Sequence, residues 1–532
     1  MQTLISITRR TVLFTALAVT FALAGPAGAE KILRVANFGE PESLDPHKVS
    51  GVWTHRVLRD IFMGLTTEGQ GGETIAGAAE SWTVSADGTV YTFKIRDHVW
   101  SDGKPVTADD FVYSFRRILL PETAAEYASL MYPMKNAEAI NTGKAAAETL
   151  GARAIDARTL EVTLRAPTPY FLTQLTHYTA WPVPKHVVEK HGDAWNKPGT
   201  IVGNGPYLLE EWVPSTHVKL VRNPKFYDAG SVKIDRVVYY PGEDRVAGQK
   251  RFRAGEVEIA TDFSSDQIDW LHKNLPKETR IAPYLGIYYY PINTTKAPFN
   301  DKRIRQAMSL AINREAITNK VLKSGEIPAY SFVPPGTPNY ASGPSYMQWK
   351  GISYKERLAQ ANKLMSEAGY GPDNPLKFTL SYNTSENHKR IAIAVAAMWK
   401  QIGVQAELFN SEVKVHYDAL KSGDFQVARA GWVADYPDPQ NFLFLLESKS
   451  GSSLNYGRYD NNEFNSLMDK AGVTSDLDAR AMLMAKAEAQ AMEDQPVIPI
   501  YYYVSKNLVS QRIVGWVDNA RDSHPVRFLD LK

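Results

Sequence analysis

Two apolar repeats alternate along the chain, and they constrain its fold more than any other feature of the sequence. Apolar residues at every second position predict half-buried strands at 91–95 and 160–164. Apolar residues at helical spacing predict helices with one buried face at 304–312, 358–368 and 391–402. Strands and helices mixed in this way predict an α/β chain with more than one hydrophobic core.

Short sequence motifs also predict where two of the helices begin or end. Thr107 and Asp110 have the spacing of a capping box, which predicts a helix from Thr107 through Phe111 and Phe115. Gly369 follows the apolar stripe at 358–368 and predicts the end of that helix, because glycine readily adopts the left-handed conformation of a C-terminal cap.

The first 29 residues are typical of an export signal rather than of the folded protein. Arg9 and Arg10 precede an uncharged apolar stretch, and Ala27-Gly28-Ala29 predicts a cleavage site before Glu30. The apolar stretch is shorter than the roughly 20 residues of a membrane span, which disfavours an uncleaved anchor helix. The arginine pair also resembles a twin-arginine signal, and the sequence leaves open which export route is used.

The mature chain is expected to be a monomer, free in the periplasm. The sequence contains no cysteine, so it has no disulfides and no lipid-modified cysteine after the signal. Removing residues 1–29 takes away two arginines and no acid, which brings the formal net charge from +2 to 0. A neutral chain lacks the electrostatic footprint of a nucleic-acid-binding protein.

The motifs of common enzymes are missing, which favours a protein that binds rather than reacts. There is no G-x-S-x-G elbow, H-E-x-x-H helix or phosphate-binding glycine loop. The histidines are scattered, and the closest pair, His186 and His191, would lie on different faces of a helix. We therefore expect no catalytic residue, no metal site and no cofactor, although catalytic groups distant in sequence could still meet in the fold.

Six segments along the chain carry a recognisable pattern when taken together. They are Glu42–His47, Ala79–Phe115, Asn204–Trp212, Leu220–Tyr227, Ile292–Ile317 and Ala428–Leu443. In this order they resemble the oligopeptide- and dipeptide-binding proteins of ABC importers, the large extracellular solute-binding type. The resemblance extends from Lys31 to Lys532 and is closest to the oligopeptide-binding branch.

The resemblance implies an α/β, two-lobed periplasmic binding protein fold of the type II, large three-domain form, with a hinge and an interlobe cleft. Domain I would comprise residues 30–62, 188–285 and 503–532. Domain II would comprise residues 63–187, and domain III residues 286–502. The hinge would lie at the chain crossings near Leu285 and Tyr503, and the lobes would close on the ligand.

The resemblance also implies the ligand site. Two strands, Ser50-Gly51-Val52 and Gly431-Trp432-Val433, would pair with the main chain of a peptide, a contact that does not depend on the peptide's side chains. Asp435 matches the aspartate that pairs with the ligand's α-ammonium group. From the residues alone, both segments could be ordinary internal strands, and Asp435 could be a turn acid ahead of two prolines.

Three further residues match family positions around the ligand. Tyr127 would lie beside the ligand's main chain, while Arg429 and His388 would meet its carboxylate at different depths. Arginine suits that role because its forked donors fit a carboxylate. The residues alone leave open a core tyrosine and an exposed histidine before a helix.

The sequence departs from the better-known oligopeptide binders at three charged positions. It has Pro291 in place of a glutamate, Leu420 in place of an arginine and Leu322 in place of a lysine. The neighbouring Lys421 and Lys323 are expected to point elsewhere. These changes put a broad ligand range in doubt.

The sequence therefore predicts a non-enzymatic periplasmic receptor that passes short peptides to the permease subunits of an ABC importer. One alternative keeps the fold but changes the ligand to a murein-derived peptide, an opine, an oligosaccharide or a metal chelate. The other alternative is a secreted peptidase or a chaperone.

Overall fold

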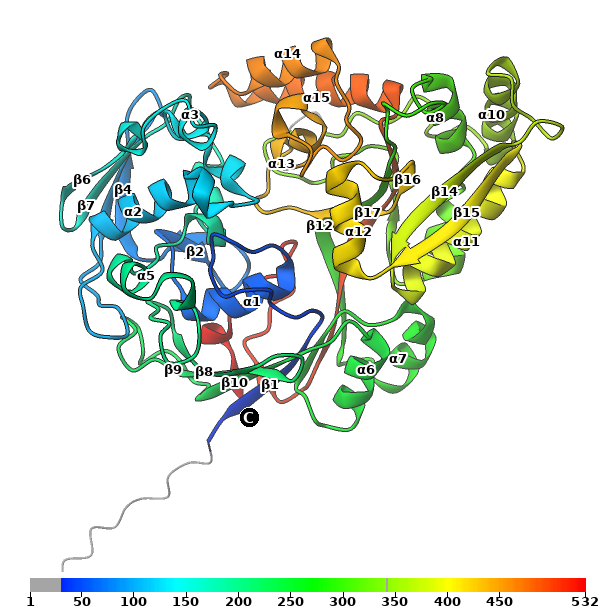
Figure 1. The fold of residues 1–532 in the computed structure, drawn as a ribbon. Coiled ribbons are helices and arrows are strands. Elements are labelled where there is room, and N and C mark those ends of the chain that lie inside the picture. Colours follow the sequence, from blue (N-terminus) through cyan, green and yellow to red (C-terminus); the bar gives the residue numbers. More distant parts are fainter. Residues whose placement is uncertain (1–29, 341–342) are drawn as a thin grey trace, which may run out of the picture.

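The structure is a computed structural model that describes residues 30–340 and 343–532. The predicted export signal, residues 1–29, lies outside the described residues. A nine-stranded sheet connects the two halves of the molecule (Figure 1). Its strands, in spatial order, are β17 (Ala430–Val433), β12 (Thr279–Pro291), β18 (Val497–Val509), β11 (Ile259–Thr261), β1 (Ile32–Asn37), β10 (Arg236–Pro241), β9 (His217–Arg222) and β8 (Tyr207–Val213), with β13 (Ile327–Pro328) paired to β18.

Buried apolar side chains divide the molecule into two main cores. One core draws on residues 287–502 alone. The other draws on residues between 33 and 259 and on the C-terminal 526–531, with a small cluster around Phe263 beside it. We call residues 287–502 the second lobe and the remaining described residues the first lobe. The long antiparallel pair β12 and β18 runs from one lobe into the other.

The first lobe adds small sheets and short helices to its share of the large sheet. Its further strands are β2 (Thr66–Glu68) with β3 (Thr74–Ala76), β4 (Ala79–Val84), β5 (Val90–Ile95), β7 (Thr159–Thr163) and β6 (Ala152–Asp156) as one antiparallel sheet, and β19 (Ile513–Val514) with β20 (Asp530–Leu531). Its helices are α1 (Val52–Ile61), α2 (Ala108–Leu119), α3 (Ala137–Asn141), α4 (Phe171–Gln174), α5 (Lys185–His191), α6 (Arg245–Arg253) and α7 (Ile268–Asn274).

The second lobe is richer in helix and contains one parallel sheet. That sheet has the order β15 (Val404–Ser411), β14 (Leu376–Asn383) and β16 (Val427–Ala428). The helices are α8 (Lys302–Leu310), α9 (Arg314–Ala316), α10 (Tyr354–Glu367), α11 (Glu386–Lys400), α12 (Val413–Ser422), α13 (Gln440–Leu443), α14 (Asn462–Ala471) and α15 (Leu477–Asp494).

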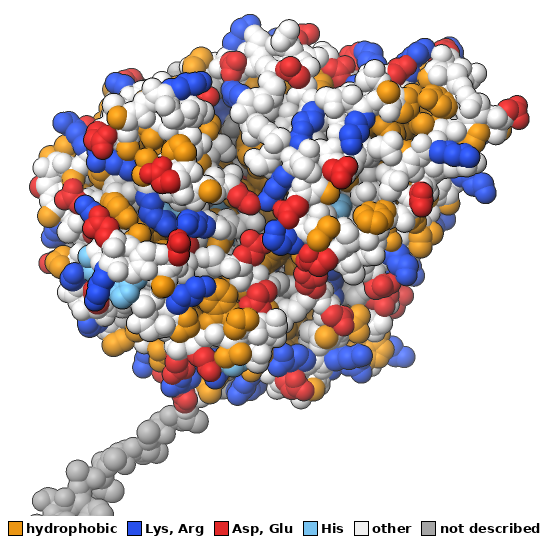
Figure 2. Space-filling view, in the orientation of Figure 1, with side chains coloured by type: hydrophobic (Ala, Val, Ile, Leu, Met, Phe, Trp, Pro, Cys, Tyr) orange, Lys and Arg blue, Asp and Glu red, His pale blue; other side chains and the backbone are white. Residues whose placement is uncertain are grey.

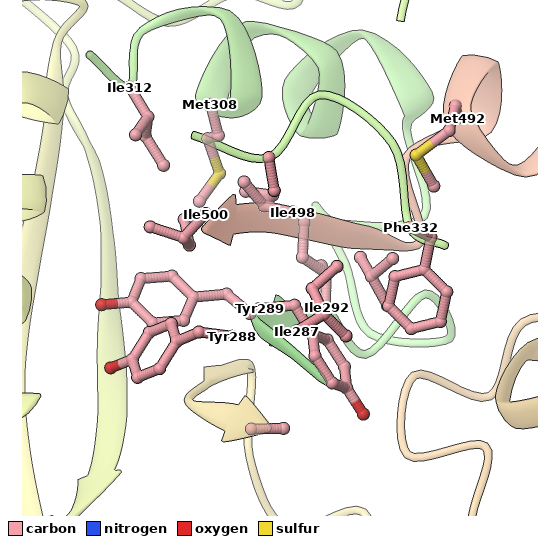
Figure 3. Close-up of a cluster of buried hydrophobic side chains, with 14 of the residues drawn as sticks. Ile287, Tyr288, Tyr289, Ile292, Met308, Ile312, Phe332, Met492, Ile498 and Ile500 are labelled. Carbon is pink, nitrogen blue, oxygen red and sulfur yellow. The ribbon is translucent and has the colours of Figure 1, made fainter. Parts of the chain in front are cut away.

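The second-lobe core forms around the two crossing strands. Figure 3 shows Ile287 and Tyr289 of β12 beside Ile498 and Ile500 of β18, with Met308 of α8 packed on them. All these side chains are at most 2% exposed. Both faces of the strand pair are covered here, which explains why β12 reads as a continuous apolar and aromatic run rather than as an alternating one.

The elements predicted from periodicity are confirmed. The strands at 91–95 and 160–164 are β5 and β7, and the three predicted helices are α8, α10 and α11. The Thr107 amide donates to Asp110 Oδ2 at 2.8 Å, completing the capping box at the start of α2. Gly369 follows α10 with φ +86°, the left-handed geometry expected of its stop.

Charges of both signs are interspersed over the face drawn in Figure 2, with no large region of a single sign. None of the helices within the described residues combines the length and the apolar character that crossing a membrane requires.

Candidate functional site

Strand β17 is the outermost strand of the nine-stranded sheet and carries the predicted residues Gly431, Trp432 and Val433. It pairs with β12 on one side, with Trp432 opposite Ile287 and Val433 opposite Gly286. No other strand of the described chain pairs with its outer edge. An unpaired edge is where an extended chain can add itself by main-chain hydrogen bonds.

The other predicted strand, Ser50-Gly51-Val52, is wrong as a strand. Val52 is the first residue of helix α1, and Gly51 is its N-cap with φ 89°. The buried residues of α1 recur at helical spacing: Thr54, Val57, Leu58 and Ile61. Packing of this face favours a helix, so the chain turns at Ser50-Gly51 and becomes helical at Val52 instead of forming a strand. Gly51 is required there, since a Cβ would lie 2.7 Å from the ring of Trp53. Contact of Ser50 and Val52 with a ligand stays a prediction.

Asp435 lies directly beyond β17, with its main chain fixed and its carboxylate only partly engaged. Its amide donates to Asn441 Oδ1 at 2.9 Å, and its carbonyl accepts from Arg521 at 3.2 Å. Oδ1 is 3.4 Å from His177 Nε2, whereas Oδ2 is buried and has no hydrogen-bond partner within the described residues. A buried, half-satisfied carboxylate is costly, which indicates a site that a ligand group completes.

No charged side chain in the described part of the chain forms an ion pair with the Asp435 carboxylate. Burial raises the pKa of its carboxyl to about 7, against smaller opposing effects of Asn441 and Arg521. Burial, together with the nearby His55 and Arg521, lowers the pKa of His177 well below its ordinary value, so this imidazole is neutral. An ammonium group placed here would favour the ionised carboxylate.

Aromatic rings flank the carboxylate from both lobes. Tyr127 of the first lobe stacks on Trp432 of the second, with ring centroids 6.3 Å apart and planes 23° apart. Tyr127 also lies 5.9 Å from the ring of His177. Trp432 Nε1 donates to the same Asn441 oxygen that holds Asp435, at 3.1 Å. The structure thus brings Tyr127, Trp432 and Asp435 together.

Arg429 lies just before β17 and is a buried cation without an acidic partner. Its guanidinium donates to Asn383 Oδ1 at 3.1 Å, to the Tyr417 hydroxyl at 3.2 Å and to the Tyr503 hydroxyl at 2.8 Å. It also lies over the ring of Tyr288 at 4.9 Å. In the part of the chain that the structure describes, no carboxylate forms an ion pair with it. Arginine stays protonated in proteins, so this buried charge favours an anionic ligand group.

His388 lies close to the same tyrosine. Its ring is 5.5 Å from Tyr288, and its Nδ1 has no partner in the described structure. It belongs to α11 and is buried, so an exposed histidine before a helix is wrong. Burial, together with the positive charge of Arg429, lowers its pKa well below the ordinary value. A neutral His388 can donate one hydrogen bond.

The three altered positions hold apolar side chains. Leu322 and Leu420 are each 1% exposed in the second-lobe core, and Pro291 ends β12. The adjacent lysines point elsewhere, as predicted: Lys421 bonds to Glu126 at 2.8 Å, and Lys323 lies 3.7 Å from Asp269. Among residues 30–340 and 343–532, no group of three His, Asp or Glu side chains could hold a metal ion.

Sequence reasoning missed most of the side chains that surround the predicted ones. They have no local signal, because they come from separate elements that only folding brings together. These residues are His177, Tyr178, Asn383, Tyr417, Asn441, Tyr503 and Arg521.

Comparison with known proteins agrees with this geometry. The chain is 43% identical over 505 residues to the periplasmic oligopeptide-binding protein OppA of Salmonella typhimurium, covering 92% of this chain and 91% of that protein. The Haemophilus influenzae OppA complex with the peptide RPPGFSPFR superimposes with a TM-score of 0.90 at 36% identity, covering 94% of this chain and 99% of that one.

The comparisons also bear on the arrangement of the lobes. The murein tripeptide-binding protein MppA of Escherichia coli, 39% identical, superimposes with a TM-score of 0.90 over 94% of this chain and 99% of that one. The unliganded open form of MppA gives only 0.71 over 94% and 98%. A model of the bacterial extracellular solute-binding proteins, family 5, matches residues 73–453. The chain belongs to this family of solute-binding proteins.

Proposed function

We propose that this protein is a receptor that captures short peptides between its lobes and delivers them to an ABC importer. One observation carries the proposal. Arg429 and Asp435, two buried ionisable groups that form no ion pair with a charged side chain among the described residues, flank the same strand, β17, whose outer edge pairs with no other described strand. A peptide in extended form has the complementary charges at its two ends and hydrogen-bonding groups between them.

The protein would bind the peptide mainly through the peptide's main chain and its two charged ends. Gly431 and Val433 would pair with the peptide backbone, and Asp435 would accept its terminal ammonium group. Arg429, together with His388, would bind the peptide's carboxylate or another acidic group. Such contacts are largely indifferent to side chains, as a transport receptor requires.

The remaining predicted residues would surround the peptide. Tyr127 and Trp432 would cover its first residues, while Ser50 and Val52 would contact it from the first lobe.

Capture would involve closure of the two lobes about the crossings near Leu285 and Tyr503. We propose residues 30–62, 188–285 and 503–532 as domain I, 63–187 as domain II and 286–502 as domain III. The higher TM-score with the MppA structure than with its open form supports a closed arrangement here. Closure on a ligand is a hinge motion.

The cellular setting follows from the export signal and from the relatives. We propose removal of residues 1–29, a free monomer in the periplasm, and docking on the permease subunits of the importer. The protein would return its ligand unchanged, without a metal, cofactor or nucleic acid. Because Pro291, Leu322 and Leu420 replace charged residues, the ligand range would be narrower than in a broad oligopeptide binder.

The test is to identify the natural ligand. The protein is purified without unfolding, then denatured, and the released small molecules are analysed by mass spectrometry. We expect short peptides with a free amino terminus, which can be recovered intact after rebinding to refolded protein. A sugar, an opine, a metal chelate, or a peptide cleaved during incubation would contradict the proposal.

A further inference from the structure

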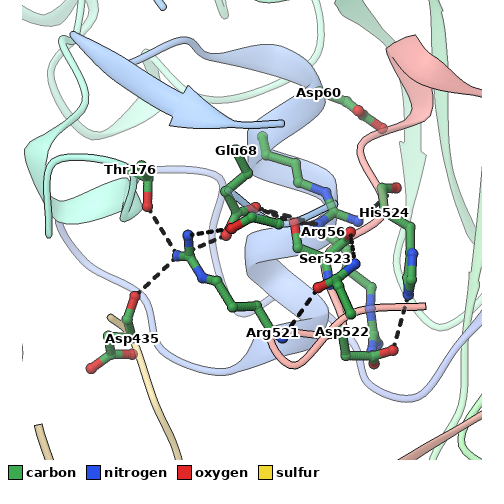
Figure 4. A network of polar contacts seen from close by, with 12 residues as sticks. Arg56, Asp60, Glu68, Thr176, Asp435, Arg521, Asp522, Ser523 and His524 are labelled. Carbon is green, nitrogen blue, oxygen red and sulfur yellow. Dashed lines mark hydrogen bonds and ion pairs between the residues drawn. The ribbon is translucent and has the colours of Figure 1, made fainter. Parts of the chain in front are cut away.

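Arg521, in the C-terminal segment of the first lobe, contacts groups of both lobes (Figure 4). Its guanidinium lies 2.8 Å from Glu68 Oε1 and donates to Thr176 Oγ1 at 3.0 Å and to the Gly72 carbonyl at 3.3 Å. These three acceptors belong to the first lobe. The fourth acceptor is the carbonyl of Asp435, at 3.2 Å, which belongs to the second lobe.

The first lobe holds Arg521 in place without help from the second. Glu68 is buried, and despite this burial the charges of Arg521, His55 and Arg59 lower its pKa to about 2. Ser523 donates to the other oxygen of Glu68, which Arg59 also approaches to 3.7 Å. The carboxylate therefore stays ionised, orients the guanidinium and neutralises its charge.

Because Glu68 neutralises Arg521, the guanidinium is not a counter-ion for the Asp435 carboxylate. Arg521 contacts the carbonyl of Asp435 and pairs with the carboxylate of Glu68, so it does not take the place that a ligand ammonium would occupy. The Asp435 amide is fixed by Asn441 of its own lobe. The carbonyl is fixed by Arg521 across the gap, and this bond can form only when the lobes are together.

We propose that Arg521 is a positioning residue that docks on the main chain of Asp435 as the lobes close, so that closure aims the carboxylate at the ligand's ammonium group. The assignment rests on the proposed role of Asp435. Nη2 contacts Glu68, Thr176 and the Asp435 carbonyl, and Nη1 contacts the Gly72 carbonyl. Lysine has a single donor nitrogen and no rigid planar head, so Arg521→Lys should lose the Gly72 contact and the fixed orientation of the other three.

The test compares Arg521→Lys with the parent protein. Alanine peptides of two to five residues, with free and with acetylated amino termini, are titrated calorimetrically, and their dissociation rates are measured. We expect Arg521→Lys to bind the free peptides about tenfold more weakly, chiefly through faster dissociation. The acetylated peptides, which do not use the aimed carboxylate, should lose much less.

Two further variants separate this role from general damage. Thr176→Val removes one group that orients the guanidinium, and should produce a smaller loss in the same direction even if Arg521→Lys folds poorly. Arg512→Lys is the matched control, because Arg512 lies in the same C-terminal segment but is 60% exposed and pairs with Glu258 instead. It should behave as the parent.

The outcomes distinguish this inference from the proposed function. If the parent binds no alanine peptide, or binds free and acetylated peptides alike, the proposed function fails. If the parent prefers the free amine and Asp435→Asn abolishes that preference, the proposed function stands. The positioning role is then overturned if Arg521→Lys and Thr176→Val match Arg512→Lys, or if they weaken free and acetylated peptides equally.

Discussion

His177 Nε2 of the first lobe lies 3.4 Å from Asp435 Oδ1 of the second, yet the two do not form an ion pair. Burial keeps the imidazole neutral by lowering its pKa, and burial raises the pKa of the Asp435 carboxyl to about 7. With the lobes together and no ligand between them, the site therefore holds a carboxyl group that titrates near neutral pH and is poised to ionise when a cation arrives.

The preference for an amine-bearing peptide over its acetylated form should therefore weaken on acidification. In the closed complex with an acetylated peptide the pKa of Asp435 stays raised, whereas the ammonium of a free-amine peptide lowers it. The preference for the free amine is therefore largest above about pH 7 and falls below it. The slope should approach, but not exceed, tenfold per pH unit until the pKa of the complex is reached. Titrations between pH 5 and 7.5 (approximate limits that keep the peptide amine protonated) measure this slope. A slope that persists in Asp435→Asn would assign it to another group.

The same carboxyl should oppose closure of the lobes in the absence of ligand. Its pKa is raised in the closed arrangement, so the closed form binds the proton more tightly, and its stability relative to the open form falls as pH rises from about 4 to about 7. Asp435→Asn should therefore favour closure of the ligand-free protein at pH 8 and change it little at pH 4. Scattering of the ligand-free protein at the two pH values checks this, with a smaller radius of gyration expected for Asp435→Asn at pH 8 alone. An equal change at both would contradict it.

Arg429 should decide the response to the ligand's acidic end. Its three hydrogen bonds all go to neutral acceptors. Arg429→Gln should weaken the binding of a peptide with a free carboxylate by roughly 1.5–3 kcal/mol, and that of its amide by much less.

The parent protein should also bind some lengths among di- to pentapeptides more tightly than others, because Leu322 and Leu420 provide no second cation for the ligand's carboxylate. Equal affinity for all lengths, with no penalty for amidation, would refute this.

Tyr170 should hold the lobes together. It lies in the first lobe between two second-lobe groups: its ring stacks on Tyr436 with centroids 4.8 Å apart, and the guanidinium of Arg480 lies 5.1 Å from it. Arg480 is fixed by a buried ion pair with Asp438 at 2.8 Å. Tyr170→Ala should weaken peptide binding by about 1–2 kcal/mol through loss of both aromatic contacts.

Scattering provides a second readout for that variant. Tyr170→Ala should show a larger radius of gyration than the parent at subsaturating ligand and the same radius at saturation. The control is Tyr346→Ala, since Tyr346 is exposed and contacts Lys350 within the second lobe. If both variants scatter and bind alike, Tyr170 does not contribute to closure.

Periodicity predicted the regular elements well, because α8, α10 and α11 each bury one face that the sequence shows directly. It could not place Ser50-Gly51-Val52, since three residues carry no period and the buried stripe that defines α1 begins only after them. Gly431, Trp432 and Val433 were found on a strand, but its edge position depends on the order of the sheet, which local sequence does not encode.

The candidate site was only partly predictable for the same reason. Arg429 and Asp435 flank one strand and were predicted together from the family resemblance of the segment Ala428–Leu443. Their surroundings could not, because His177 and Arg521 reach Asp435 from distant parts of the first lobe. Only the folded structure shows that neither group has a counter-ion among the described residues.

The most direct test of the account is a calorimetric double-mutant cycle that combines Asp435→Ala with acetylation of the peptide's amino terminus. Removing one member of a buried charge pair costs roughly 3–5 kcal/mol, so Asp435→Ala should weaken a free-amine peptide by about 10²–10³-fold. We predict that acetylation is costly in the parent and nearly neutral in Asp435→Ala, because both changes delete the same interaction. If the two penalties simply add, Asp435 does not bind the ammonium group, and the proposal that this site captures peptides by their amino terminus is contradicted.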